Sequence, residues 1–274
     1  MTGDDAMHPF VALMRRYCID YTSSHDLSVC DEIMEPEYVV HISGFDLRRD
    51  ESYRPQVQLL FDAAPGLDLR VHELVLNGDR LAMRFSEHAS LPTEDGGRSL
   101  ACWAGISLYR WNGARLLECS VEQDFLARQQ QLAGGTPHAL EAPHLDPWLG
   151  TEAVPADPKA EEVARRWLTG GDLTAAGSVV VDDSRVTGSP SVVVEPTRVE
   201  VRDLFSAGDR VAFHAEVVGP YRGGIADVGD EHLGTEATLL VAGLATVAGD
   251  AVEQVHLVTT RMGVRAQLTG ASPV

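Results

Sequence analysis

Residues 76–85 read LNGDRLAMRF, and residues 206–215 read SAGDRVAFHA. Each stretch places Gly-Asp-Arg between two runs rich in apolar residues, which is typical of two strands joined by a tight turn. A pattern that recurs once in a chain of this length indicates an internal repeat. The sequence therefore predicts two copies of one unit, each built around a β-hairpin.

A segment rich in proline and glycine separates the two copies. Residues 133–158 hold several prolines, which interrupt helices. We expect a first domain over 1–132, a linker over 133–158 and a second domain over 159–274. The second copy has no counterpart of residues 50–64, so we expect a degenerate copy that packs on the first as an intrachain pseudo-dimer. A homodimer of the whole chain stays open.

The composition is that of an acidic globular protein. The 274 residues are 44% hydrophobic, and 22 Lys and Arg against 41 Asp and Glu give a net charge of −19. Such a surface repels phosphate backbones and anionic lipids, so we expect no nucleic-acid or membrane partner. The N-terminal residues lack the basic stretch of a secretory signal, and the four cysteines show no Cys-x-x-Cys spacing. We expect a cytoplasmic protein with reduced thiols.

The spacing of apolar residues gives a coarse element order for the first copy. The predicted helices cover 10–21, 27–34, 54–64 and 126–132. The predicted strands cover 38–42, 69–76, 81–89, 100–111 and 115–125. Helices that precede an antiparallel sheet describe an α+β roll, in which the helices cover one face of a curved sheet. We therefore expect an α+β fold of two tandem cone-like rolls.

This order resembles the SnoaL-like branch of the nuclear-transport-factor-two-like superfamily. The matching stretches are SHDL (24–27), PEYVVH (36–41), LNGDRLAMRF (76–85), YRWNG (109–113) and the run from Glu118 through Asp124 to Leu132. The resemblance implies a conical fold with a deep, mostly apolar pocket between helices and sheet. Relatives include polyketide cyclases, ketosteroid isomerase and epoxide-opening enzymes, while others only bind ligands or proteins, so the fold alone assigns no chemistry.

The resemblance also implies an acid/base role for Asp124, near the end of the last predicted strand. A carboxyl group in an apolar pocket has a raised pKa, which suits proton transfer near neutral pH. The alternative is structural: an aspartate at this position caps the helix that follows, by accepting hydrogen bonds from its first N–H groups.

The last hairpin supplies further candidates. A two-residue turn at 112–113 would place on one face the side chains of Trp103, Tyr109, Glu118, Glu122 and Asp124. Glu118 and Glu122 would then supply a second carboxyl group, as acid-assisted epoxide opening requires. The alternative is that these acids face solvent at an edge of the sheet.

Four more residues complete the predicted site. His41 ends a short strand and would hydrogen-bond the substrate or Asp124. Arg84 would orient a substrate carbonyl group, or form an ion pair with Glu118 or Glu122. Tyr17 and Phe61, with Trp103 and Tyr109, would line the pocket, although aromatic residues at this spacing also form plain cores.

We therefore expect a cofactor-independent cyclase that acts on a small apolar intermediate of polyketide type in natural-product biosynthesis, with Asp124 and His41 as catalytic groups. The alternatives are an epoxide-opening hydrolase or cyclase, a ketosteroid-isomerase-like isomerase, and a non-catalytic ligand-binding or assembly module. The sequence holds no Gly-x-Gly-x-x-Gly after a strand, no P-loop and no His-Glu-x-x-His motif. Neither a metal nor a nucleotide cofactor is expected.

Overall fold

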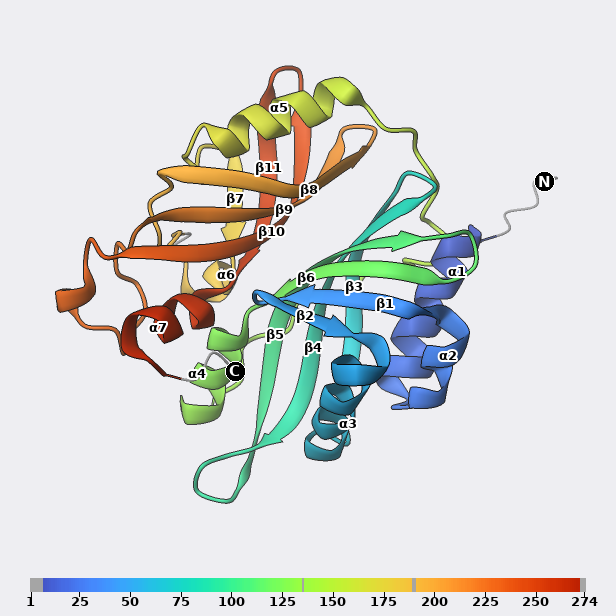
Figure 1. The fold of residues 1–274 in the computed structure, drawn as a ribbon, viewed down its shortest axis with the longest axis horizontal. Helices are drawn as coiled ribbons and strands as arrows, with labels where there is room; N and C mark the ends of the chain where they lie inside the picture. Colours follow the sequence, from blue (N-terminus) through green and yellow to red (C-terminus); the bar gives the residue numbers. More distant parts are fainter. Residues whose placement is uncertain (1–6, 135, 189–190, 272–274) are drawn as a thin grey trace.

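A computed structural model describes residues 7–134, 136–188 and 191–271. These residues form two units, each with one curved sheet, and the helices that begin each unit lie on the sheet face away from the other unit (Figure 1). The C-terminal helices of the two units contact each other. The expected α+β class, with two tandem rolls, is confirmed.

The helices of the first unit begin with α1 (Pro9–Arg16), which continues as a π-helical stretch over Tyr17–Ser23. Proline is favoured in a first helical turn, and the imidazole of His8 accepts a hydrogen bond from the N–H group of Phe10. The other helical elements are a 3₁₀ turn (Leu27–Val29), α2 (Cys30–Ile33), a π-helical turn (Arg49–Tyr53), α3 (Arg54–Ala63) and α4 (Phe125–Gly134). The three longer helices fall where the apolar spacing predicts them.

The first sheet has the strand order β2-β1-β6-β5-β4-β3, in which β1 and β6 are parallel and the other neighbours antiparallel. The strands are β1 (Met34–Ile42), β2 (Phe45–Arg48), β3 (Asp68–Leu76), β4 (Arg80–Pro92), β5 (Arg98–Trp111) and β6 (Leu116–Gln123). Strand β2 is absent from the sequence prediction. It pairs with β1 across a turn at Ser43 and Gly44, whose φ angles of 51° and 85° suit a two-residue hairpin turn.

The β5–β6 hairpin differs from its predicted register. The turn is centred one residue later than expected, because the N–H group of Asn112 bonds to the carbonyl group of Arg115. A bulge next to the turn then adds one more residue to β6, so that Ile106 pairs with Glu122. The shift exchanges the two faces of β6 relative to β5, because side chains alternate along a strand. The prediction that Trp103 and Tyr109 share one face of the sheet with the acidic residues of β6 is therefore wrong.

The second unit has the strand order β7-β11-β10-β9-β8, with β7 parallel to β11. Its strands are β7 (Ser178–Val181), β8 (Arg198–Ala207), β9 (Arg210–Pro220), β10 (Glu236–Ala248) and β11 (Ala251–Thr259). Its helices are α5 (Pro158–Thr169), α6 (Ser184–Thr187), α7 (Arg261–Thr269) and a 3₁₀ turn (Asp230–His232).

The two units repeat the same local features. Each Gly-Asp-Arg motif forms the turn between corresponding strands, β3–β4 and β8–β9, and each of these pairs has a bulge, after Val71 and after Val201. The second unit has the four-residue α6 between its first two strands, where the first unit has the ten-residue α3. Helix α5 covers the second sheet, where Trp167 packs edge-on against Phe213 at 6.0 Å. That the second unit is a degenerate copy stays a prediction.

The two sheets pack face to face, each by the surface away from its helices (Figure 1). An apolar cluster fills the contact, with Ile106 and Leu108 from the first sheet against Ala242, Leu244 and Val258 from the second. The segment between the units runs along the first one. Its residues His144 and Val154 donate backbone hydrogen bonds to β3, and Trp148 packs on the first core. Among the described helices, none is long and apolar enough to cross a membrane.

Candidate functional site

The first unit encloses a cavity of about 500 Å³ between its helices and its sheet. The predicted pocket residues Tyr17, Phe61 and Tyr109 line it. Most of its remaining lining is apolar and includes Val40, Val57, Leu60, Leu69, Phe85 and Val121. Phe45 and Leu59 also border the cavity and are exposed, so it reaches the surface between β2 and α3. A space of this size and polarity suits a small, mostly apolar molecule.

Tyrosine hydroxyl groups are the main polar groups on the helical side of the cavity. The hydroxyl oxygens of Tyr17 and Tyr53 lie 3.1 Å apart and share a hydrogen bond. The buried hydroxyl group of Tyr21 has no hydrogen-bond partner among the described residues. Burial raises the pKa of Tyr17 and of Tyr21 well above the usual value, so both stay protonated and can donate hydrogen bonds to a ligand.

Glu87 places a carboxyl group on the sheet side of the same cavity. It lies on β4, on the face that also carries the buried Leu81, Met83 and Phe85, and is 8% exposed. Burial raises the pKa of Glu87 to about 7, against the opposing influence of the Arg128 guanidinium and the Trp103 indole. The sequence prediction missed this residue. One feature of the sequence could have indicated it: Glu87 is the one acidic residue on a face of β4 that is otherwise apolar.

Arg128 and Gln123 border the cavity beside Glu87. The Arg128 guanidinium lies 4.6 Å from the ring centre of Phe125 and 5.3 Å from that of Trp103. Trp103 does not line the cavity itself, but its indole N–H donates a 2.7 Å hydrogen bond to the side-chain oxygen of Gln123. Trp103 therefore supports this end of the cavity from behind.

Asp124 lies outside the cavity. It follows Gln123 directly, so its side chain leaves the opposite face of the sheet, toward the second unit. Both carboxylate oxygens accept hydrogen bonds from Arg261, at 2.8 and 2.7 Å, and one also accepts the N–H group of Ala127 at 3.2 Å. The latter is the helix-capping contact of the alternative interpretation. The sequence predicts this carboxyl group inside the pocket of the first unit; it lies instead on the opposite face of the sheet.

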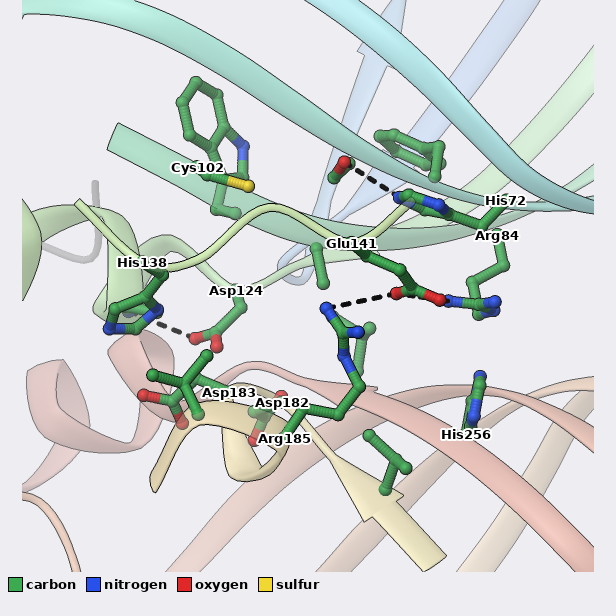
Figure 2. A pocket seen from close by; sticks show the side chains of 18 of the residues that line it. His72, Arg84, Cys102, Asp124, His138, Glu141, Asp182, Asp183, Arg185 and His256 are labelled. Carbon is green, nitrogen blue, oxygen red and sulfur yellow. Dashed lines mark hydrogen bonds and ion pairs between the residues drawn. The ribbon is translucent and has the colours of Figure 1, made fainter. Parts of the chain in front are cut away.

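Arg261 joins the two units through a buried group of acids. Besides Asp124 it contacts Asp182 at 3.2 Å and Asp183 at 2.9 Å. Figure 2 shows that these three acids lie close together. Burial raises the pKa of Asp182 to about 7, although Arg261 opposes the shift. One cation thus contacts three carboxyl groups, one from the first unit and two from the second.

Arg84 also faces the cleft between the units. Its guanidinium contacts Glu141 at 2.9 Å, and Arg185 reaches the same Glu141 at 3.2 Å (Figure 2). Arg84 also lies 3.7 Å from Glu73. The expected ion pair with Glu118 or Glu122 is therefore wrong. Arg84 does not border the cone cavity, because it alternates with Phe85 along β4.

His41, Glu118 and Glu122 face the second unit as well. His41 hydrogen-bonds Asp46 at 2.6 Å and Glu118 at 3.0 Å. Glu122 hydrogen-bonds His214 at 2.8 Å and is fully buried. These residues lie on the face of β1 and β6 that the register shift turns away from the cavity. Within the described ranges, no group of three His, Cys, Asp or Glu side chains could hold a metal ion.

Comparison with known proteins follows the same division of the chain. Residues 14–119, which lie within the first unit, match the family model of the SnoaL-like domain. Among curated protein sequences, none matches the chain.

Solved structures also resemble about half of the chain. A proposed polyketide cyclase from Acidithiobacillus ferrooxidans is 21% identical, covering 46% of this chain and 94% of its own, with a TM-score of 0.41. IdmH, a proposed polyketide cyclase from Streptomyces antibioticus, is 18% identical over 46% of this chain and 98% of its own, with a TM-score of 0.42. An LEH-like epoxide hydrolase from M. tuberculosis is 12% identical over 47% of this chain and 92% of its own, with a TM-score of 0.38.

Proposed function

We propose that this protein is a cofactor-independent enzyme of the cyclase class, and that its first unit binds a small, mostly apolar intermediate of polyketide type. Glu87 is the general base and acid, in the role that the sequence suggested for Asp124. One observation carries the proposal: a buried carboxyl group with a pKa of about 7 lines an apolar cavity. A base with a pKa near the working pH combines a large ionised fraction with strong proton affinity.

The proposed reaction begins with removal of a proton from a carbon next to a carbonyl group. The carboxylate of Glu87 forms an O–H bond as the C–H bond breaks, and the electron pair moves onto the carbonyl oxygen. The resulting enolate carbon attacks a second carbonyl carbon of the same molecule and closes a ring. Glu87 then returns its proton to the new alkoxide, so no external reactant is consumed.

Epoxide opening is the weaker alternative. Acid-assisted opening by a carboxyl pair requires a second acid within one water molecule of the first. Among the described residues that line the cavity, Glu87 is the one carboxylic acid. This lining favours single-carboxyl proton transfer over a paired mechanism.

The proposal is tested by hydrogen exchange at a carbon acid. 2-Tetralone is a flat, apolar ketone, and removal of its α-proton in D₂O is read as deuterium uptake by mass spectrometry. We expect catalysed exchange to rise about tenfold per pH unit below pH 7 and to level off above it, because only ionised Glu87 accepts a proton. The uncatalysed rate is subtracted at each pH. Absence of catalysed exchange, with the ketone bound, would favour a binding module.

A further inference from the structure

A buried carboxyl group and a partly buried guanidinium group border the same end of the cavity without contacting each other. Glu87 and Arg128 both line it and influence each other's pKa electrostatically. Among the described residues, no hydrogen bond joins them, nor any ion pair at the 4.0 Å limit. Charged groups that are largely removed from water are ordinarily paired. A cavity wall with two unpaired charges is therefore suited to a polar group that a ligand inserts between them.

The Arg128 guanidinium is held in a defined position. Its central carbon lies over the rings of Phe125, 4.6 Å from the ring centre, and Trp103, 5.3 Å from the ring centre. Trp103 is itself fixed by its hydrogen bond to Gln123. Aromatic contacts of this kind occupy the face of a guanidinium and leave its N–H donors available at the edge. Arg128 can therefore bind an oxygen atom in the cavity with little reorganisation.

We infer that Arg128 binds the carbonyl oxygen of the substrate, which becomes negative when Glu87 removes the proton. This inference rests on the function proposed above and adds the group that stabilises the enolate. Arg128 stabilises the enolate through hydrogen bonds from a cation, which are stronger than those from neutral donors.

The charge balance of the site favours a neutral ligand over a bound carboxylate. An anionic ligand would meet Arg128 but would be repelled by ionised Glu87. A neutral carbonyl compound gains negative charge on its oxygen as Glu87 loses its own charge. The net charge at this end of the cavity then stays constant through the proton transfer, and the attraction to Arg128 passes from Glu87 to the enolate.

The test uses a stable mimic of the enolate. 4-Nitro-1-naphthol is flat, and its neutral and anionic forms absorb at different wavelengths, so its apparent pKa when bound is read directly from absorbance. 1-Methoxy-4-nitronaphthalene cannot ionise and reports occupancy of the cavity alone. The variants are Arg128→Gln, Arg128→Lys and Glu87→Gln, with Arg15→Gln on the exposed side of α1 as the matched control.

In the wild type and in Arg15→Gln, we expect the apparent pKa of bound nitronaphthol to lie below that of the free compound. Arg128→Gln should raise it by one unit or more, which is about a tenfold loss of affinity for the anion. Arg128→Lys should retain part of the preference for the anion. Glu87→Gln should strengthen this preference, because it removes a negative charge near the bound anion. All variants should bind the methoxy compound within twofold of the wild type.

Equal affinity of Arg128→Gln and the wild type for the anion would overturn the inference and leave the proposed function standing, since exchange at 2-tetralone would be unaffected. Failure of the wild type to bind either compound would overturn both, because the cavity would then be closed to flat apolar ligands. Loss of the methoxy compound in Arg128→Gln alone indicates a collapsed cavity, and Arg128→Lys then decides: an apparent pKa equal to that of the free compound contradicts the inference.

Discussion

Glu87→Gln is expected to slow the catalysed exchange of 2-tetralone by about 10²- to 10⁴-fold, the usual range for loss of a general base. Glutamine matches glutamate in size and keeps the carbonyl oxygen, but it cannot accept the proton at neutral pH. The cavity should therefore keep its shape while the reaction loses its base. The measurement is the initial rate of deuterium uptake at pH 8, where Glu87 is ionised in the wild type.

Two matched variants distinguish the loss of Glu87 from the loss of any other acidic side chain. Glu94→Gln removes an exposed acid in the turn of the same hairpin, and its rate should equal that of the wild type. Asp124→Asn removes the acid that the family resemblance suggests, and its rate should stay within a few-fold of the wild type because this carboxyl group is outside the cavity. A fall of two orders of magnitude in Asp124→Asn, with unchanged exchange in Glu87→Gln, would return the acid/base role to Asp124.

Arg261→Met is expected to lower the free energy of unfolding by about 3–5 kcal/mol, the usual cost of leaving a buried charge without its partner. Arg261 is only 11% exposed and is the shared partner of Asp124, Asp182 and Asp183. Without it, three carboxyl groups would repel one another away from water. The measurement is urea denaturation at pH 7.

The pH dependence of the Arg261 variant provides a second readout. Burial already raises the folded-state pKa of Asp124 and of Asp182, and loss of the cation that opposes this shift raises both further, so the folded state holds more protons than the unfolded state. The stability of the variant then falls as the pH rises through these pKa values. The loss of unfolding free energy relative to the wild type should therefore be smaller at pH 5 than at pH 8. Adding Asp124→Asn should restore part of the loss.

Arg265→Met, one turn further along α7, is the matched control. Its partner Asp227 is 53% exposed, so the loss should stay below about 1 kcal/mol. Equal losses in the two variants would contradict a special role for Arg261 in joining the two units.

Local patterns in the sequence predict most of the first unit. The amphipathic spacing of Phe10, Leu13 and Met14 marks α1, and the Gly-Asp-Arg turns mark the hairpins that recur in both units. Three of the predicted pocket residues, Tyr17, Phe61 and Tyr109, do line the cavity, because helix periodicity and strand alternation are local properties.

The positions of the charged residues could not be predicted in the same way. One bulge beside the turn at residues 113–114 reverses which side chains of β6 face the cavity, and nothing in the local sequence specifies it. The partner of Asp124 is Arg261, 137 residues away, and Arg84 pairs with Glu141 of the proline-rich segment. Such pairings depend on how the units pack, which periodicity does not describe.

The proton affinity of one side chain tests the account most directly. In protein labelled with ¹³C at the glutamate side-chain carboxyl carbon, the resonance absent from Glu87→Gln identifies Glu87, and its chemical shift is followed from pH 4 to pH 9. We expect a midpoint at about 7, because burial in the cavity disfavours the ionised form. A midpoint near 4.5, the ordinary value for glutamate, would show a carboxyl group in contact with bulk water and would contradict the proposed base.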